Sequence, residues 1–371
     1  MAGHRLLRLT AWTAALSGLL LAPAHAAPPQ WERVPIPPLG GLALPMEVAA
    51  AGPRAAWASG LEDMTTGQKP FMLAWNGREW RRQTLPVPNS AAVKDIAAAG
   101  PRDAWALAEY REQGEPSQVR PLALHWNGTA WRKVGYPAGV LPTMPSPLPY
   151  YSEVVSAPPG GPAWSIGHDA QAGESVALRF QGGRWKRQKL PVRMTGASTV
   201  GVRSAKDVWI SCTCVLPGTG PTQAMLHWNG ARWKTVRYPA AEQGYIAKIV
   251  PVSATSVWAY RAGTDATRPA ALLHWNGTAW TEAAIPASPF GFSIPTLADD
   301  GRKGAWVSVS LSDGPGYLHY DGARWTTEGG SGRPMNSALV YDLARVPGTR
   351  TLWSVGLANP LNGPAFIERR R

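Results

Sequence analysis

The sequence predicts an all-β fold, a single seven-bladed β-propeller of four-stranded blades. A Trp-rich hairpin recurs along the chain, a second Trp recurs between the hairpins, and Gly and Pro break the sequence into short segments. With 39 Gly and 36 Pro among 371 residues, few windows are long enough for an ordinary helix, and residues that favour strands fill the gaps. We therefore expect strands and very little helix.

The repeated hairpin is clearest at 124–137 (LHWNGTAWRKVGYP), 226–239 (LHWNGARWKTVRYP) and 273–286 (LHWNGTAWTEAAIP). Asn-Gly favours a two-residue turn in which both central residues take positive φ, a geometry that matches the twist of the hairpin. Each copy therefore predicts a strand C, a tight turn and a strand D. Looser copies lie at 73–86, 178–191 and 318–330.

The second Trp lies in a short strand between successive hairpins, which we interpret as strand B. Its copies are 45 to 59 residues apart, the repeat length of propeller blades and longer than that of most helical repeats. With an innermost strand A, each unit predicts one four-stranded blade; six or eight blades, or two smaller sheets, are the alternatives. The seven copies are Trp57, Trp105, Trp164, Trp209, Trp258, Trp306 and Trp353.

The two ends of the propeller sequence complement each other. The segment WERVPIP at Trp31 fits a strand D without the three strands that should precede it, and the chain ends in GPAFIERRR without a strand D. We predict that the N-terminal strand pairs with the C-terminal strands, which closes the ring and leaves no open edge. Residues 27–371 then form one domain.

Residues 1–26 have the features of a secretory signal peptide. Arg5 and Arg8 precede a short apolar stretch, and A-x-A follows at 24–26. We expect cleavage before Ala27, a secreted, extracellular protein and no membrane span after cleavage; a retained N-terminal anchor is the alternative. The formal charge of +13 falls to +11 without these two arginines. Such a surface attracts anionic polymers, and we expect no specific nucleic-acid ligand.

The motif LHWNGxxW, followed by VWAVG-like segments, resembles secreted actinobacterial repeat proteins that form β-propellers. The C-to-D turns are also similar to degenerate Asp-boxes of sialidase-type propellers, because Gly-x-x-Trp is kept, and Asp321-Gly322 is the nearest acidic copy. The resemblance implies the fold. It transfers no activity, since Asp-boxes lie away from catalytic centres.

The tryptophans and most histidines fall into repeat positions, which indicates a packing role. His125, His227, His274 and His319 occupy the same place in different blades, so they lie too far apart to share a metal ion. We expect no cofactor and no metal. His168 lies outside the repeat.

Cys212 and Cys214 lie two residues apart and share one face of a predicted strand B. Three interpretations remain open: a disulfide, two reduced thiols, or part of a metal or redox site. Export favours the disulfide.

The irregular D-to-A and B-to-C connections are where we expect a ligand, because loops that vary over a constant scaffold carry function. We predict a monomeric, non-enzymatic binding module for an extracellular glycan, an anionic wall polymer or a protein. Candidate contacts are Glu62, Asp63, Glu109, Arg111, Tyr150, Tyr151, Glu153, His168, Asp169, Tyr245, Arg261, Asp265, Phe290 and Phe292.

The alternative is an exported sialidase-like glycoside hydrolase or lyase. Such an enzyme needs a Tyr activated by Glu with a separate Asp, and YYSE places Tyr150 and Tyr151 near Glu153. Asp63 or Asp169 would supply the acid. Arginines to hold a substrate carboxylate would be Arg111, Arg120 and Arg261.

Overall fold

The structure, a computed structural model, contains strands and turns and no helix in the residues it describes. No helix long and apolar enough to cross a membrane occurs in that part of the chain. The described residues are 31–112, 115–142, 154–239, 244–263, 269–286, 294–311, 314–331, 338–359 and 363–371.

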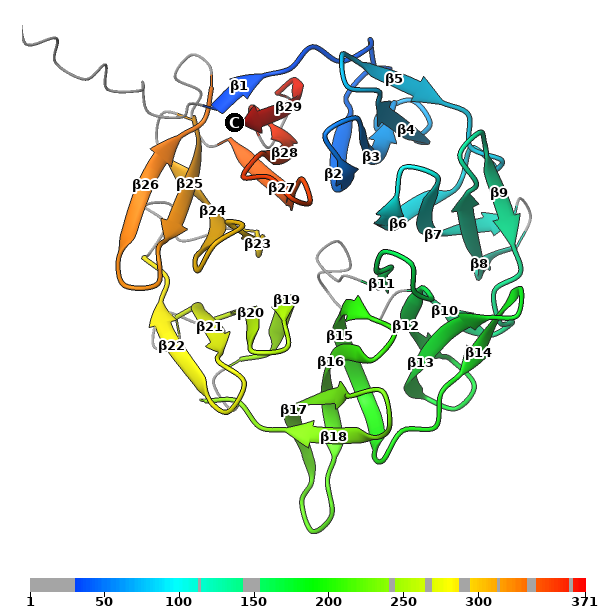
Figure 1. Cartoon of the computed structure of the whole chain (residues 1–371). Helices are drawn as coiled ribbons and strands as arrows, with labels where there is room; N and C mark the ends of the chain where they lie inside the picture. Colours follow the sequence, from blue (N-terminus) through cyan, green and yellow to red (C-terminus); the bar gives the residue numbers. More distant parts are fainter. Residues whose placement is uncertain are drawn as a thin grey trace, which may run out of the picture.

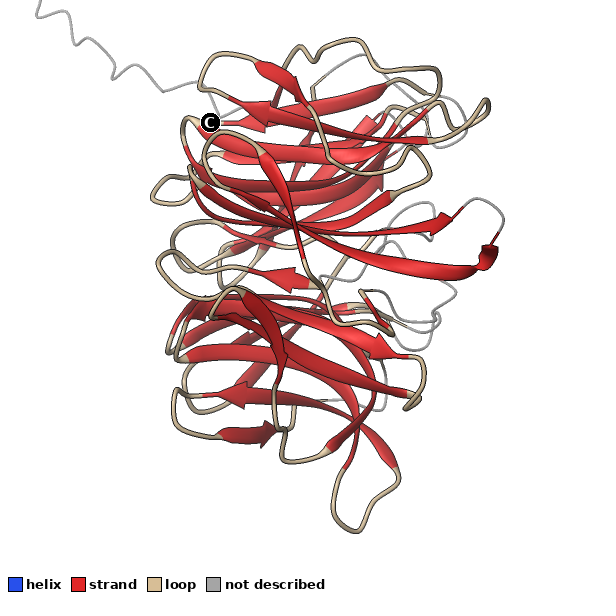
Figure 2. Ribbon diagram, turned by 90° about the vertical axis from the view of Figure 1, so that its right-hand side faces the viewer, coloured by secondary structure: helices blue, strands red, loops and turns tan. Residues whose placement is uncertain are grey.

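The strands are grouped in twisted sheets arranged in a ring, with one strand of each group innermost (Figure 1). Viewed from the side, the strands lie across the thickness of the ring and the connections lie on its two faces (Figure 2). The fold is a β-propeller.

Five sheets have four strands each, ordered from the innermost strand outward. They are β2 (Leu44–Gly52), β3 (Ala55–Glu62), β4 (Lys69–Trp75) and β5 (Trp80–Gln83); β6 (Ala92–Gly100), β7 (Asp103–Glu112), β8 (Glu115–Trp126) and β9 (Trp131–Val134); β19 (Ile246–Ser253), β20 (Ser256–Arg261), β21 (Ala271–Trp275) and β22 (Trp280–Ala284); β23 (Ala298–Asp299), β24 (Ala305–Leu311), β25 (Gly314–Tyr320) and β26 (Trp325–Gly329); and β27 (Leu339–Arg345), β28 (Leu352–Leu357), β29 (Ala365–Arg370) and β1 (Trp31–Arg33).

The remaining strands form one nine-stranded sheet, so the prediction of seven separate four-stranded blades is wrong. β15 is unusually long and reaches the neighbouring strand β13, where Met194 pairs with Ser175. This one bridge joins two groups of strands. The strands are β10 (Val140–Leu141), β11 (Val155–Ser156), β12 (Trp164–Asp169), β13 (Glu174–Gln181), β14 (Arg184–Arg187), β15 (Arg193–Ser204), β16 (Asp207–Val215), β17 (Pro221–Trp228) and β18 (Trp233–Val236).

The predicted closure is confirmed, because β1 is the outermost strand of the sheet formed by the C-terminal strands (Figure 1). Trp31 pairs with Arg370, and Arg33 pairs with Glu368, in antiparallel register. Trp31 is buried and stacks on Tyr317 of the preceding sheet, with ring centroids 3.6 Å apart. The N-terminal strand therefore contributes both backbone pairing and core packing.

The charged end of β29 sends its side chains alternately to the two neighbouring sheets, because strand side chains have a period of two. Arg370 donates to both carboxylate oxygens of Glu328 at 2.7 and 2.9 Å. Arg369 instead donates to Glu32 Oε1 of its own sheet at 2.8 and 2.5 Å and lies over the ring of Trp75 in the next sheet. Arg369 and Arg370 thus stabilise the contacts of the last sheet with its two neighbours.

The strand B tryptophans pack neighbouring groups of strands against each other, between sheets in most cases and within the nine-stranded sheet for Trp164 and Trp233. Trp57 meets Trp126 and Trp131 of the following sheet, with centroids 6.2 and 6.4 Å away. In each case the partners are aromatic residues at the end of strand C or the start of strand D. The same contact recurs from Trp105 to Phe180 and Trp185, from Trp164 to Trp233, from Trp209 to Trp275 and Trp280, from Trp258 to Tyr320, from Trp306 to Trp31, and from Trp353 to Trp75 and Trp80.

The Asn-Gly turns differ from the predicted two-residue turn. Trp126 pairs with Trp131, so four residues form the loop, and only the Gly has positive φ. Asn127 Oδ1 accepts hydrogen bonds from the backbone N–H groups of Thr129 and Ala130, both at 3.0 Å. The Asn therefore acts through its side chain, an Asx turn.

The predicted two-residue turn occurs in the copy that lacks Asn. Gln181 pairs with Arg184, and Gly182 and Gly183 both have positive φ, 62° and 76°. Asp321, the acidic copy, accepts from its own loop as the Asn residues do. In the four-residue loops the Asp or Asn therefore contributes its side-chain oxygen, whereas the tighter turn at Gly182-Gly183 forms without it.

We predict that Asn127→Ala destabilises the protein by about 1 kcal/mol, because two loop N–H groups lose their acceptor. Asn127→Asp keeps the acceptor and should stay within about 0.5 kcal/mol of the parent. Urea unfolding monitored by Trp fluorescence measures both. Equal losses in the two variants would contradict the assignment.

Removing the closing strand should destabilise the whole ring. Trp31→Ala is expected to cost about 3–5 kcal/mol through the lost buried aromatic packing, and deletion of residues 27–40 should cost more. Thermal and urea unfolding provide the measurement, with Glu79→Ala on an exposed turn as the control. A deletion variant that melts like the parent would refute closure by β1.

Candidate functional site

The connections of the propeller define two faces, because strands A and C run in one direction and B and D in the other. We call the edge with the B-to-C and D-to-A connections the loop face, and the edge with the A-to-B and C-to-D turns the turn face. The predicted site lies on the loop face.

Three of the predicted loop-face residues form ion pairs from strand B to strand D of their own sheets. Glu62 accepts from Arg82 at 2.5 Å, and Asp169 is bound by Arg187. In a third sheet the charges are reversed, and Arg261, almost fully buried, donates to Glu282 at 2.5 Å. These pairs tie the outer strand to the sheet.

The pKa values of the two carboxyls reflect these contacts. The hydrogen bond from Arg82 is the main cause that lowers the pKa of Glu62, helped by the backbone N–H of Gly40. The backbone N–H of Ala172 and then Arg187 lower the pKa of Asp169. Both carboxylates are therefore ionised acceptors, a state unsuited to a general acid.

Two further candidates also have partners close by. Asp63 lies 3.3 Å from Lys69, and Glu109 Oε1 lies 2.8 Å from Lys94 Nζ. The carbonyl of Arg111 accepts from the Ser90 hydroxyl at 3.0 Å. Asp63 is also the one described non-glycine residue with positive φ, 56°.

His168 and Tyr245 lie apart from these pairs. His168 lies in β12 between Leu141 and Ser175 in register, and its Nδ1 is buried without a hydrogen bond among the described residues. Burial raises the pKa of Tyr245, whose carbonyl accepts from Ala262 at 2.9 Å. Neither approaches an acid in a catalytic arrangement.

Tyr150, Tyr151, Glu153, Asp265, Phe290 and Phe292 lie outside the described residues. The described candidates are distributed over several sheets, and Glu62, Glu109, Asp169 and Arg261 each bind a partner in their own sheet. The structure does not bring them together into one site.

A hydrogen-bonded Tyr–Glu pair does occur, but at a position the sequence did not indicate. Tyr317 donates to Glu368 Oε2 at 2.9 Å, Ser354 Oγ lies 2.7 Å from Tyr317 Oη, and Ser331 donates to Glu368 Oε1 at 2.8 Å. Tyr317 and Glu368 have no exposed surface. A substrate therefore cannot reach this pair. Its hydrogen bond joins β25 of one sheet to β29 of the next.

Buried charges near the ring axis are a second group that the sequence did not indicate. Asp342 accepts from the backbone N–H of Val48 at 3.0 Å and binds Lys248 Nζ at 3.2 Å. Asp95 accepts from the N–H groups of Val154 and Val155 at 2.7 and 2.8 Å. Asp342, Lys248 and Asp95 each follow a β-bulge in strand A. In the sequence, the available signal was a single acid within an otherwise largely apolar strand, as at Asp95 and Asp342.

The repeat histidines stack on the strand B tryptophans, as in Trp209 and His227, whose ring centroids are 4.0 Å apart. His227 Nε2 also lies 2.8 Å from Asp207 Oδ1. No group of three or more metal-binding side chains occurs among the described residues. The histidines are separate, each within its own sheet, as predicted.

Cys212 and Cys214 form a disulfide, with Cα atoms 5.5 Å apart. Both are buried in β16, near the loop face. This decides among the three interpretations that the sequence left open.

A pocket lies on the turn face, where the closing sheet, formed by β27, β28, β29 and β1, meets the sheet of β2–β5. Its volume is about 430 Å³. Sequence reasoning missed it because its walls come from both ends of the chain. It is lined by Pro53, Trp75, Gly77, Arg78, Val346, Thr351, Trp353, Arg369 and Arg371.

The arginines give this pocket a positive charge. The Arg369 guanidinium lies 5.3 and 5.4 Å from the ring centroids of Trp75 and Trp353, which hold it in place by cation–π contact. Glu32 Oε1 accepts from both Arg369 and Arg371. Partial burial opposes ionisation, yet the two arginines lower the pKa of Glu32.

Solved structures with similar folds are β-propellers. They include YCF48 bound to a D1 peptide (12% identity, 92% of this chain and 96% of that chain covered, TM-score 0.56). YCF48 from Cyanidioschyzon merolae (14%, 92% and 98%, 0.55) is also similar. So is the β-propeller domain of the Trilobed protease from Pyrococcus furiosus (6%, 89% and 97%, 0.53), which has an open velcro topology, whereas β1 closes the ring in this protein. No family model and no curated protein match the sequence.

The buried Glu368 generates a pH prediction. Burial, the largest cause, raises the pKa of Glu368 above its ordinary value. The folded state thus holds the proton more tightly, so this group's stabilisation is present below the unfolded pKa, about 4.3, and is lost as pH rises through the folded value.

Glu368→Gln should remove this contribution. As pH rises across this window, we expect the free energy of unfolding of the parent to fall relative to that of the variant. Urea unfolding at a series of pH values measures both. A difference between the two proteins that does not change with pH would contradict the raised pKa.

Proposed function

We propose that this protein is an exported β-propeller that binds an extracellular ligand without catalysing a reaction, the ligand being a glycan, a wall polymer or a protein with negative charge. The observation that carries the proposal is the arginine-lined pocket on the turn face. Arg78 and Arg371 are exposed at its wall, and Arg369 is oriented within it.

The charge balance of the pocket favours an anionic group. Three guanidinium groups line it, and the carboxylate of Glu32 accepts from two of them. Carboxylate and phosphate groups match the planar donor pattern of arginine. A ligand carrying such a group would bind beside Arg78 and Arg371, whose side chains are exposed.

The state of the loop-face candidates supports binding over hydrolysis. Of the two acids predicted as proton donors, Asp169 is held ionised by Arg187, and Asp63 lies 3.3 Å from Lys69. A sialidase-like site remains the second candidate for the loop face, where Tyr150, Tyr151 and Glu153 were predicted. The peptide-bound YCF48 propeller supports a protein ligand as one possibility.

We also infer that the nine-stranded sheet corresponds to two blades joined at one bridge. β11 and β15 both lie innermost in Figure 1, and Ser175↔Met194 is the one register pair between the two groups. With the five separate sheets this inference gives a sevenfold ring.

The pocket can be tested with the double variant Arg78→Gln/Arg371→Gln. We expect its affinity for galacturonate oligomers, glycerol phosphate or acidic peptides, whichever the parent binds, to fall about tenfold, since two charge-assisted contacts are lost. Isothermal titration calorimetry measures it. The matched control is Arg132→Gln/Lys133→Gln on the outer strand β9. A parent that binds none of these probes, or an unchanged double variant, would overturn the proposal.

A further inference from the structure

The turn face carries exposed basic side chains that the turns themselves hold in position. A Cβ on Gly77 would lie 3.0 Å from Arg54 Cγ, and a Cβ on Gly128 would lie 2.8 Å from Arg102 Nε. The side chain of Lys206 lies over Gly230 in the same way, at 2.7 Å. In these three copies the glycine of the C-to-D turn thus leaves room for the basic side chain of the neighbouring A-to-B turn, whereas Gly277 faces Thr255 instead.

This packing presents charge in a regular way. The aliphatic stem lies on the glycine while the charged end stays in water, a common arrangement for Arg and Lys. Because part of each stem is already in place, less side-chain entropy is lost when a ligand binds. One exposed basic residue of these turns, Arg324, pairs with Asp321. The others are Arg54, Arg78, Arg102, Lys206, Arg232, Arg302, Lys303 and Arg350.

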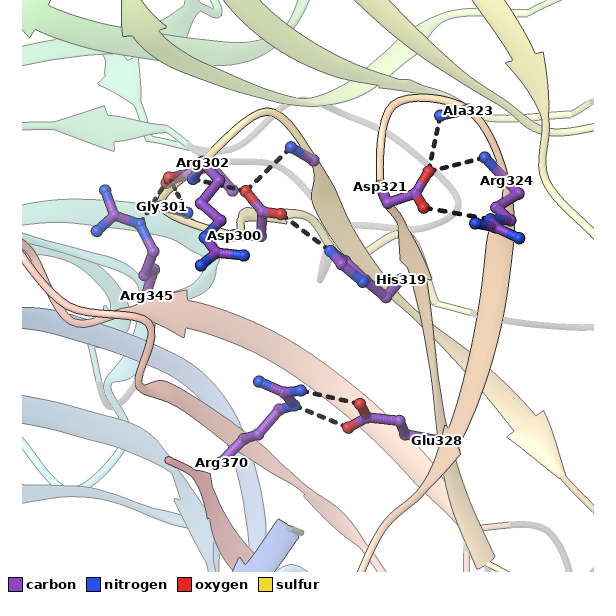
Figure 3. Close-up of polar contacts among 12 residues, drawn as sticks. Asp300, Gly301, Arg302, His319, Asp321, Ala323, Arg324, Glu328, Arg345 and Arg370 are labelled. Carbon is purple, nitrogen blue, oxygen red and sulfur yellow. Dashed lines mark hydrogen bonds and ion pairs between the residues drawn. The ribbon is translucent and has the colours of Figure 1, made fainter. Parts of the chain in front are cut away.

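The acids of the turn face do not neutralise these residues, because each has another partner. Asp300 accepts from the N–H groups of Arg302 and Gly304 and from His319, and Asp321 accepts from its own turn and lies near Arg324 (Figure 3). Four further pairs are Asp103–His125, Asp207–Arg203, Glu79–Arg81 and Asp299–Arg345. Within the described residues, no ion pair involves the eight basic side chains.

The two faces therefore differ in charge. On the loop face the described basic residues Arg82, Arg187 and Arg261 each bind an acid. On the turn face some arginines, such as Arg324 and Arg371, bind acids, but the eight basic side chains form no ion pair within the described residues and are distributed over several sheets. A field of this kind attracts an extended anion more strongly than a small one, since several contacts form on one chain.

We propose that the turn face binds an extended anionic polymer, with carboxylate or phosphate groups along its chain, that crosses several sheets. The inference rests on the proposed binding function and extends it from the pocket to the whole face. The pocket beside Arg78 would hold one group of the polymer, and Arg54, Arg102 and Lys206 would hold others.

A nucleic acid fits this face less well. Sequence-tolerant binding of single strands depends on exposed aromatic rings on which bases stack. Trp75 and Trp353 are instead buried, and Trp75 Nε1 donates to the carbonyl of Pro53 at 3.1 Å. The pocket therefore provides charge without an exposed ring for stacking, and Trp126, Trp228 and Trp275 elsewhere on the face are half-buried.

The test compares two triple variants that remove the same charge from different places. Arg54→Gln/Arg102→Gln/Lys206→Gln alters the turn face, and Arg132→Gln/Lys133→Gln/Lys234→Gln alters exposed residues of the outer strands β9 and β18. Binding of inorganic polyphosphate, polygalacturonate and single-stranded poly(dT) is measured by fluorescence titration at about 0.15 M salt, where nonspecific attraction is screened. Thermal unfolding checks that both variants fold.

We expect the turn-face variant to lose about tenfold or more in affinity for polyphosphate or polygalacturonate, and the outer-strand variant to change less than about twofold. Equal losses in both variants, or tighter binding of poly(dT) than of both other polymers, would overturn the inference. If the parent binds the small anionic probes but neither polymer, the proposed function stands and this inference fails. If the parent binds neither the small anionic probes nor the polymers, both the proposed function and this inference fail.

Discussion

The contact on which the ring depends is the packing of each strand B tryptophan against the aromatic residues at the C-to-D hairpin of the following sheet. A single sheet has two apolar faces and cannot bury them alone. Trp57, Trp209 and Trp353 each meet a pair of aromatic rings from the next sheet. Because the same contact recurs from sheet to sheet, the two ends of the chain must finally meet.

That meeting uses interactions that the other sheets do not need. Trp31 takes the place of a hairpin aromatic beside Trp306, and Glu32 binds Arg369 and Arg371. Near the axis, Asp342 binds the backbone of Val48, so the closing sheet is also tied to the next at its inner edge. The inner acids satisfy N–H groups near the bulges of strand A, where unpaired groups would be costly.

The distribution of charge over the two faces follows from how the turns are built. Loop-face charges span strands B to D and bind each other, whereas turn-face cations project from tight turns whose acids accept from nearby backbone and side-chain donors. Asp321 illustrates the difference, since its carboxylate shapes its own turn and lies near Arg324. The positive face is therefore a consequence of turn chemistry as well as of composition.

The sequence by itself determined the all-β propeller and its closure, because Trp registers and Asn-Gly turns repeat with one period and each copy reports local structure. It also indicated that the four repeat histidines are separate. It did not determine that β15 would reach β13, that Asn127 would act through its oxygen, or that Cys212 and Cys214 would be joined. Those outcomes depend on backbone register and on distances between strands.

The candidate site was less predictable than the fold. Glu62, Asp169 and Arg261 were chosen as loop residues, and only the tertiary structure revealed their partners on strand D. The pocket joins Arg78 to Arg369 and Arg371, which are nearly the whole chain apart, and no local pattern encodes that contact. The repeats specify the strands and turns within each sheet. Closure of the ring alone decides which side chains of the first and last sheets meet.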